Sequence, residues 1–135
     1  LATRVPLPNA FAMVIEFTSD GNGGRLEFGP LAGDNDSGYR VAYTQGAPRG
    51  LELLLSGNRG SSVIDGTRGP LALEDRRLHE IQLLRQENGE MTVLVDRVER
   101  LRATDRSYGG RFQGVSLSGD GGRFAIRSVS VYAKP

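Results

Sequence analysis

The fold is decided by residues 78–95, which read LHEIQLLRQENGEMTVLV. Two runs of alternating apolar residues flank the pair Asn88-Gly89 in this stretch. Asn-Gly between two such runs indicates a two-residue β-hairpin turn, because both residues tolerate a positive φ. Residues 71–87 are also rich in Leu, Glu, Arg and Gln, which favour helix. The hairpin signal decides between the two, so we expect a loop or one turn of helix around residues 74–77, a strand over 78–86 and a return strand from Met91.

Apolar residues recur with a period of two along most of the remaining chain, the pattern of half-buried strands. Each run is short and ends at Gly, Asn, Asp or Pro, which is typical of strands joined by tight turns. The expected strands cover residues 11–17, 25–28, 39–44, 51–55, 62–65, 78–86, 91–95, 98–102, 112–117 and 124–132. A bulge near Arg127-Ser128 is expected to bring four apolar residues of the last strand to the core side, namely Phe124, Ile126, Val129 and Val131.

About ten short strands, Gly-rich turns and almost no helix predict an all-β fold, an antiparallel two-sheet β-sandwich of the jelly-roll type. A closed barrel is the alternative, but it usually has longer and more uniform strands. The chain has 135 residues, 38% of them hydrophobic, which suits one domain over residues 1–135. Because the first residue is Leu1, we expect this domain to be excised from a larger protein. The predicted core is Phe11, Met13, Ile15, Phe17, Leu53, Ile81, Leu83, Val93, Val95, Val115, Leu117 and Val129.

Composition excludes several classes of function. The net charge is +1 with 24% charged residues, which does not suit a dedicated nucleic-acid binder. No run approaches the roughly 18 apolar residues of a membrane-spanning helix. Cysteine is absent, which excludes disulfides and thiolate metal sites. We therefore expect neither a nucleic-acid partner nor insertion into a membrane.

Five segments follow one another in the order and pattern of a known family. They are Leu78-His79-Glu80-Ile81, Asn88-Gly89, Val95-Asp96, Phe112-Gln113-Gly114-Val115-Ser116-Leu117 and Phe124-Ala125-Ile126-Arg127-Ser128-Val129. This succession resembles the concanavalin A-like lectin/glucanase superfamily, especially its bacterial laminin-G-like and keto-disaccharide-hydrolase-like domains. The resemblance spans residues 11–132 and departs at Arg97, where the pattern usually has Gly. It implies a concanavalin A-like jelly roll and the roles found in that family, which are sugar binding, calcium binding and non-catalytic adhesion.

Catalytic constellations are missing from the sequence. A retaining glucanase needs two carboxylates about 5 Å apart on one strand face, whereas Glu16 and Glu52 stand alone and Asp96 and Glu99 flank a turn. His79 is the single histidine and has no cysteine to share a zinc ion. No Gly-x-Ser-x-Gly elbow accompanies it. We therefore expect a domain without catalytic activity.

Two turns carry oxygen-bearing side chains in a pattern that suits calcium. Asp34-Asn35-Asp36-Ser37-Gly38 offers ligands at alternate positions before a glycine, and Asp20-Gly21-Asn22 offers a second cluster. Calcium takes about six to eight oxygen ligands on flexible loops. The prediction is a calcium site at Asp34 and Asp36, aided by Asp20 or Asn22. The alternative is a pair of plain turns, since turns are built from the same residue types.

Aromatic and arginine side chains are the candidate ligand contacts. Tyr108 lies in the Gly-rich loop of residues 105–110 with Arg106 before it and Arg111 after it. Loops at the edges of a rigid sandwich are where binding groups are usually found. Tyr39 and Tyr43 share one strand face and form either a sugar platform with Arg40 at its edge or part of the core.

These observations lead to two hypotheses of different classes. The first is a non-catalytic carbohydrate-binding, lectin-like domain of a bacterial extracytoplasmic protein, with a glycan or polysaccharide as its partner. The second is a structural or protein-interaction module of the same fold without a small-molecule site. In the first hypothesis Tyr108 stacks on a sugar face, while Arg106 or Arg111 binds hydroxyls or a carboxylate.

Overall fold

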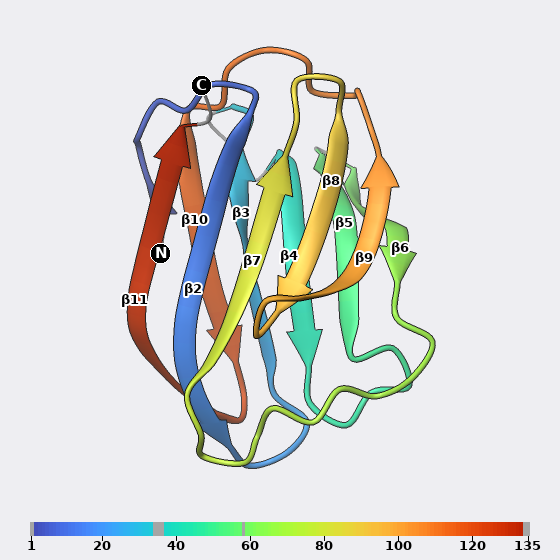
Figure 1. The fold of residues 1–135 in the computed structure, drawn as a ribbon, viewed down its shortest axis with the longest axis vertical. Coiled ribbons are helices and arrows are strands. Elements are labelled where there is room, and N and C mark those ends of the chain that lie inside the picture. Colours follow the sequence, from blue (N-terminus) through green and yellow to red (C-terminus); the bar gives the residue numbers. More distant parts are fainter. Residues whose placement is uncertain (1, 34–36, 58, 134–135) are drawn as a thin grey trace.

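A computed structural model describes residues 2–33, 37–57 and 59–133 and arranges them as two antiparallel sheets packed face to face (Figure 1). The strands are β1 (Ala2–Thr3), β2 (Phe11–Asp20), β3 (Arg25–Leu31), β4 (Gly38–Thr44), β5 (Leu51–Gly57), β6 (Gly60–Gly66), β7 (His79–Arg85), β8 (Glu90–Val95), β9 (Val98–Thr104), β10 (Gly114–Asp120) and β11 (Arg123–Ala133). One sheet has six strands in the order β1-β10-β3-β4-β5-β6, and the other has five in the order β11-β2-β7-β8-β9.

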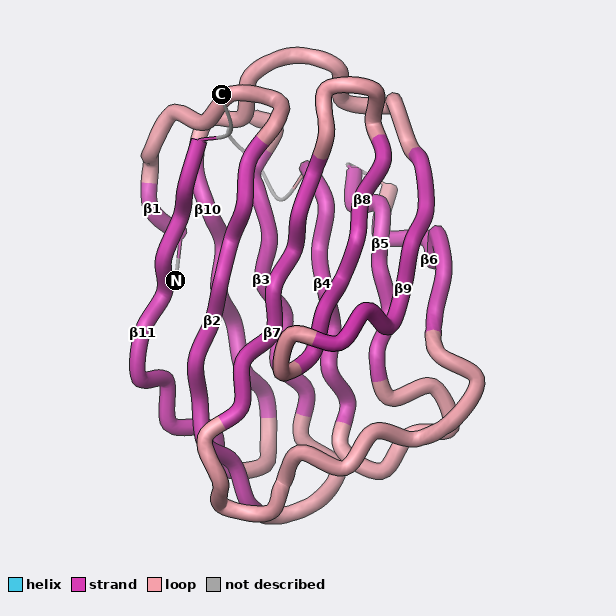
Figure 2. Tube along the Cα trace, viewed as in Figure 1, coloured by secondary structure: helices cyan, strands magenta, loops and turns pink. Residues whose placement is uncertain are grey.

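The predicted fold class is confirmed, because strands and loops account for all of the described chain (Figure 2). Residues 71–78 form an extended connection with a bend at 75–77, so the helical alternative for residues 71–87 is excluded. Strand β1 has only two residues and was not predicted, since so short a segment has no periodicity to detect. Within the described ranges no helix is long and apolar enough to cross a membrane.

The core lies between the two sheets and follows the period of two. In β2, Phe11, Met13, Ile15 and Phe17 are fully buried, while the residues between them are half-exposed. Successive strand residues point to opposite faces, so this alternation buries one face of β2 against the other sheet. Nine of the predicted core residues are buried: Phe11, Met13, Ile15, Phe17, Leu53, Ile81, Leu83, Val93 and Val95. Val115 and Leu117 are partly buried and pack against this core.

The hairpin at Asn88-Gly89 exists, but its turn has three residues and not the predicted two. The amide of Gly89 donates to the carbonyl of Gln86 at 3.0 Å, and only Gly89 in this loop has a positive φ, +89°. A type I turn followed by a residue in the left-handed region produces this geometry. The amide of Glu90 then donates to the side chain of Asn88 at 3.0 Å, which stabilises the turn.

The two-residue turn lies instead between β8 and β9. Asp96 and Arg97 both have positive φ, +49° and +68°, and Val95 pairs with Val98 across them. Asp tolerates the left-handed region better than most residues, and the carboxylate of Asp96 accepts the amide of Glu80 at 2.9 Å. These contacts stabilise Asp96-Arg97 in a turn where the pattern of the concanavalin A-like superfamily usually has Asp-Gly.

The predicted bulge in β11 is confirmed, and its consequence for burial holds for Phe124 and Val131, which are partly buried and pack against the core, but not for Ile126 and Val129. The register with β2 shifts between Ile126 and Ser128, and Val129 and Val131 then pair with buried residues of β2. Val129 is nevertheless 39% exposed and Ile126 is 37% exposed, so the prediction of Val129 as a core residue is wrong. Strand β11 is the edge of its sheet, where a core-facing side chain has cover on one flank only.

Candidate functional site

A polar trough crosses the outer face of the six-stranded sheet. Its volume is about 410 Å³ and every strand of the sheet contributes to its lining: Ala2 of β1, Ser116 and Ser118 of β10, Glu27 of β3, Arg40 of β4, Ser56 of β5 and Ser61 of β6. These residues alternate with side chains that point into the core, such as Phe28 and Val41. The period of two therefore places the polar lining on a rigid surface.

The charged groups of the trough are held in place by neighbouring atoms. Arg40 is 5% exposed, and its guanidinium donates to the carbonyls of Pro30 at 2.9 Å and Tyr39 at 2.8 Å. Glu27 accepts a bond of 2.6 Å from the guanidinium of Arg25, which also donates to Thr44. Side chains fixed in this way lose little entropy when a ligand binds.

A second hollow of about 380 Å³ lies at the end of the β5–β6 hairpin. It is lined by Leu55, Gly57, Arg59, Gly60, Ser61, Ser62 and Tyr108. Ser61 also lines the trough, so the two hollows meet at this residue. Apolar groups of Leu55 and Tyr108 form one part of the lining, and hydroxyls and a guanidinium form the other, which is the mixture found in small-molecule sites.

Tyr108 is anchored in this hollow and is less free than the sequence indicated. Its hydroxyl donates to the carbonyl of Ser56 at 2.5 Å, and its ring meets that of Tyr39 edge to face at 5.4 Å. The side chain is partly buried and packs against the core. The expectation of an aromatic without packing partners is therefore corrected, although Tyr108 is still one of the residues that line the hollow.

A buried arginine holds the loop that carries Tyr108. Arg85 is 1% exposed and donates to the carbonyls of Asp105 and Tyr108, both at 3.1 Å. Its guanidinium carbon lies 4.7 Å from the centroid of the Tyr39 ring. Asn9 adds bonds of 3.0 Å to Tyr108 and 2.7 Å to Gly110. No sequence motif predicted this network, because its members come from four separate segments of the chain.

Tyr39 closes the network from the opposite side. Its hydroxyl donates to the carboxylate of Asp105 at 2.7 Å. Burial and this hydrogen bond raise the pKa of Tyr39 to about 12. Burial acts to raise the pKa of Asp105, but the bonds from Tyr39 and Ser107 and the charge of Arg85 outweigh it and lower that pKa. Asp105 is therefore a carboxylate at neutral pH that counterbalances Arg85.

The other residues that are predicted to contact a ligand lie in different parts of the structure. Tyr39 and Tyr43 are fully buried, which excludes them as a surface platform and confirms the core alternative. Arg106 is exposed and donates to the carbonyl of Asn88 at 2.7 Å, away from the hollow. Arg111 is exposed and lines neither the trough nor the hollow. Arg40 lies in the trough and Tyr108 in the hollow, so these two stay predictions for ligand contact.

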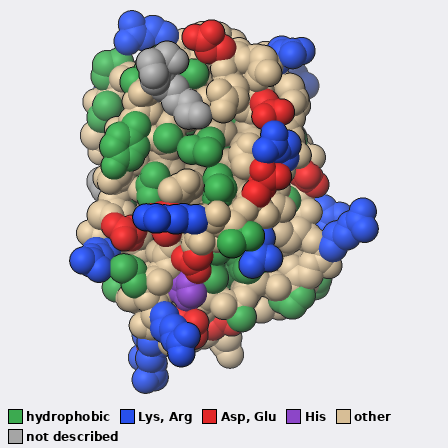
Figure 3. Space-filling model, in the orientation of Figure 1, with side chains coloured by type: hydrophobic (Ala, Val, Ile, Leu, Met, Phe, Trp, Pro, Cys, Tyr) green, Lys and Arg blue, Asp and Glu red, His purple; other side chains and the backbone are tan. Residues whose placement is uncertain are grey.

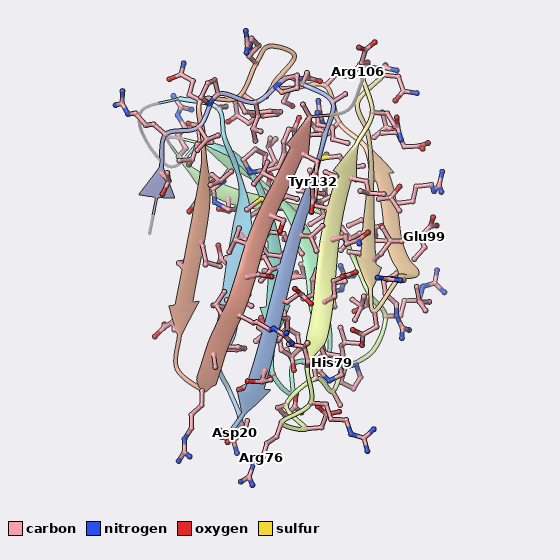
Figure 4. All side chains as sticks on the ribbon, turned by 60° about the vertical axis from the view of Figure 1, so that its left-hand side comes forward. Asp20, Arg76, His79, Glu99, Arg106 and Tyr132 are labelled. Carbon is pink, nitrogen blue, oxygen red and sulfur yellow. The ribbon has the colours of Figure 1, made fainter. Side chains whose placement is uncertain are left out.

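The structure describes only some of the residues that are predicted to bind calcium. Asp34 and Asp36 lie outside the described residues. Asp20 lies at the lower end of the sandwich beside Arg76 (Figure 4), with Arg76 and Arg123 at 3.4 Å and 3.6 Å. Strand β3 starts near Asp20 and ends at Leu31 at the opposite end of the sandwich (Figure 1). Asp20 therefore lies at the other end of β3 from Ala32 and Ser37, which are hydrogen-bonded to each other. The described part of the chain contains no group of three His, Cys, Asp or Glu that could hold a metal ion.

His79 has a partner on each ring nitrogen. Nε2 lies 2.7 Å from a carboxylate oxygen of Asp75, and Nδ1 lies 2.7 Å from one of Asp96. Both contacts are satisfied together only when both nitrogens carry a proton. Burial lowers the pKa of His79, but the hydrogen bonds to Asp96 and Asp75 outweigh burial and raise it. His79 therefore ties the connection before β7 to the β8–β9 turn, near the lower end of the sandwich (Figure 4).

Comparison with solved structures relates this architecture to lectin folds. The chain superimposes on the carbohydrate binding module CBM66 from Bacillus subtilis with a TM-score of 0.71 and 17% identity, covering 98% of this chain and 78% of that one. Sheep galectin-11, in complex with glycerol, gives 0.74 and 17% identity over 97% and 96% of the two chains. Congerin II with lactose and MES gives 0.72 and 15% identity over 97% and 98%. The chain has the jelly-roll β-sandwich fold of these proteins. No protein-family model and no curated protein sequence matches it.

Proposed function

We propose that this chain is a non-catalytic carbohydrate-binding domain of the concanavalin A-like lectin/glucanase superfamily, carried by an extracytoplasmic bacterial protein. The observation that carries the proposal is the trough, which all six strands of one sheet line and to which five of them contribute polar side chains. The shared fold supports it, because a carbohydrate binding module and a lactose-liganded protein have the same architecture.

The chemistry of the trough suits a sugar. A sugar hydroxyl donates one hydrogen bond and accepts others, and a serine hydroxyl does the same. Ser116, Ser118, Ser56 and Ser61 supply such groups, while Glu27 accepts only and the Arg40 guanidinium donates only. The volume of about 410 Å³ falls in the range of small-molecule sites.

The test is a printed array of neutral oligosaccharides, followed by calorimetric titration of the glycans that bind. We expect Ser116→Ala and Glu27→Gln to weaken binding about tenfold, because the first removes a hydroxyl that bonds the ligand and the second replaces a charged acceptor by a neutral amide. Ser130→Ala is the matched control, since Ser130 is partly buried on β11 and pairs with Val14 on the outer face of the other sheet. An array without any bound glycan, or equal weakening by the control, would overturn the proposal. Fractionation of the producing cells tests the extracytoplasmic location.

The outer face of the five-stranded sheet favours a second candidate function, a protein-interaction module. Tyr132 is 57% exposed and pairs with Ala12, which pairs with Leu84. Val14 and Leu94 lie in the next row across the same face, and Figure 3 shows hydrophobic side chains gathered over β11 and β2. Substitution of Tyr132 by Ser leaves glycan binding unchanged if the trough is the functional surface.

A further inference from the structure

The hollow at the end of the β5–β6 hairpin contains a cation with no acidic partner among the described residues. Arg59 lies in the turn between the two strands and is exposed. Among residues 2–33, 37–57 and 59–133 it has no hydrogen bond and no ion pair. The described residues that line the hollow include no aspartate or glutamate. A guanidinium in this setting favours an anion, and its planar fork matches the geometry of a carboxylate or a sulfate.

The aromatic wall of the same hollow is already fixed before any ligand arrives. The hydroxyl of Tyr108 is bonded to Ser56, and the loop backbone at Tyr108 accepts the bond from Arg85. Because Tyr108 is fixed at its hydroxyl and at its backbone, its side chain is pre-organised, and little conformational entropy is lost when a ligand stacks on it.

Glycines keep the space beside Tyr108 open. A Cβ atom added at Gly57 would lie 3.5 Å from the Tyr108 hydroxyl, and one added at Gly60 would meet nothing within 4 Å. Gly60 also has a φ of +105°, which side chains rarely adopt. These two positions therefore leave room for a ligand ring next to Tyr108 and Arg59.

The hollow and the trough are joined through two serines. Ser61 lines both of them. Ser56 lines the trough, while its carbonyl accepts the hydroxyl of Tyr108. A ligand that fills the trough can therefore continue across Ser61 and reach Arg59 without leaving the surface.

We propose that this hollow is a second subsite, which takes an acidic sugar residue of a glycan whose neutral part occupies the trough. The inference rests on the proposed function and adds the class of ligand. The acidic sugar stacks on Tyr108, and its carboxylate or sulfate binds Arg59. The ligand is accordingly an oligosaccharide of at least two residues and not a single neutral sugar.

The experiment is an array on which each neutral oligosaccharide stands beside its uronylated, sialylated and sulfated forms, followed by titration of matched pairs. We expect at least one acidic form to bind about tenfold more tightly than its neutral parent, as a charge-assisted hydrogen bond provides. Arg59→Gln should reduce that preference to parity while binding of the neutral parent is unchanged. Arg111→Gln is the control, because Arg111 is also exposed and lines neither the trough nor the hollow. The uronylated, sialylated and sulfated arms distinguish a carboxylate ligand from a sulfate ligand.

The outcomes separate this inference from the proposed function. Equal binding of neutral and acidic forms by the parent protein overturns the subsite and leaves the trough standing. The same holds if Arg59→Gln retains the preference or Arg111→Gln removes it. Acidic glycans that bind through Arg59 with no effect of Ser116→Ala overturn the trough and leave the hollow as an independent site. An array without any bound glycan overturns both.

Discussion

The hydroxyl of Tyr108 donates a hydrogen bond of 2.5 Å to the carbonyl of Ser56, a residue 52 positions earlier in the chain. This bond fastens the loop between β9 and β10 to the end of β5. Because Ser56 also lines the trough, the loop and the outer face of the six-stranded sheet form one continuous surface. Tyr108 therefore contributes to stability and, in the proposed subsite, to recognition, and substitutions of this residue can separate the two.

We expect Tyr108→Phe to lower the free energy of unfolding by about 1 kcal/mol, the usual net value of one hydrogen bond. Tyr108→Ala should cost about 2 kcal/mol or more, because it also removes the edge-to-face contact with Tyr39. Urea denaturation of both variants measures the difference. If Tyr108→Ala unfolded at the same urea concentration as the parent, the ring would not be a packing residue.

Arg85 should be among the most sensitive positions for stability. Replacement by Met keeps an apolar side chain of similar length but removes the charged donor to the carbonyls of Asp105 and Tyr108. These carbonyls then keep only the neutral donors Tyr39 and Asn9. Hydrogen bonds from a charged group contribute about 1.5–3 kcal/mol each, so we expect a loss of about 3 kcal/mol in denaturant unfolding. Arg111→Met, at an exposed position, should change stability by less than about 0.5 kcal/mol. Similar losses in the two variants would contradict the role of Arg85 in holding the loop.

The bridge formed by His79 predicts a pH dependence. The pKa of His79 is raised above its ordinary value of 6.5 in the folded state. Its contribution to stability is therefore fully present below about pH 6.5 and is lost as the pH rises through the folded pKa. We expect the free energy of unfolding to fall as the pH rises above about 6.5, and this fall to be absent in His79→Gln.

Asp75, a partner in that bridge, titrates in a different window. The hydrogen bond from His79 lowers the pKa of Asp75 below its ordinary value of 3.8. Its contribution is present above that value and is lost only as the pH falls through the folded pKa. Titration of Asp75 therefore does not affect the comparison above pH 6. A parent protein with the same pH profile as His79→Gln would show that the bridge contributes nothing.

Two apolar residues that pair across β2 and β11 test the assignment of the core. Ile15 is fully buried, whereas its partner Val129 is 39% exposed. We expect Ile15→Ala to cost about 2–5 kcal/mol by thermal or chemical unfolding, and Val129→Ala to cost less than about 1 kcal/mol. Comparable losses in the two variants would mean that β11 is covered by something beyond the two sheets.

This pair also shows how far the sequence could predict the fold. The alternation of residues 11–17 identifies the buried face of β2, because one face of a strand in a sandwich must be apolar. The apolar pattern of residues 124–131, with a bulge near Arg127-Ser128, predicts in the same way that Val129 points to the core side. It carries no information on whether an edge strand has cover from the opposite sheet, since that depends on where distant strands end. The sequence alone therefore could not predict which side chains are buried at the edges of the sandwich.

The candidate site was less predictable than the core for a similar reason. Tyr108 and Arg40 could be selected as candidates from their residue types and loop or edge context. Arg59 and Arg85 could not be selected in this way. Arg59 lies in a turn with no distinguishing motif, and Arg85 lies in an alternating strand where nothing in the sequence marks it as buried. Arg85 donates to Tyr108 and Arg59 lines the same hollow as Tyr108, although Tyr108 is more than twenty positions away from each.

The hairpin that decides the fold gives the last prediction. Gly89 has a φ of +89°, and a Cβ atom there would lie 2.8 Å from Cγ of Arg106 and 2.9 Å from the carbonyl oxygen of Asp105. The left-handed backbone costs about 1–2 kcal/mol for a residue with a side chain, and the contact with backbone at Asp105 adds to it. We expect Gly89→Ala to lose about 2 kcal/mol or more in the free energy of unfolding.

Gly109→Ala is the matched control for that variant. Gly109 lies on the same loop as Tyr108, its φ is not in the left-handed region, and a Cβ atom there would meet nothing within 4 Å. It should unfold within about 0.5 kcal/mol of the parent. The amide of Asp105 also donates to the carbonyl of Gly89 at 3.1 Å, so strain at Gly89 reaches the base of the Tyr108 loop. Gly89→Ala should therefore weaken binding of acidic glycans more than binding of neutral ones, whereas equal weakening would place the Tyr108 loop outside the influence of the hairpin.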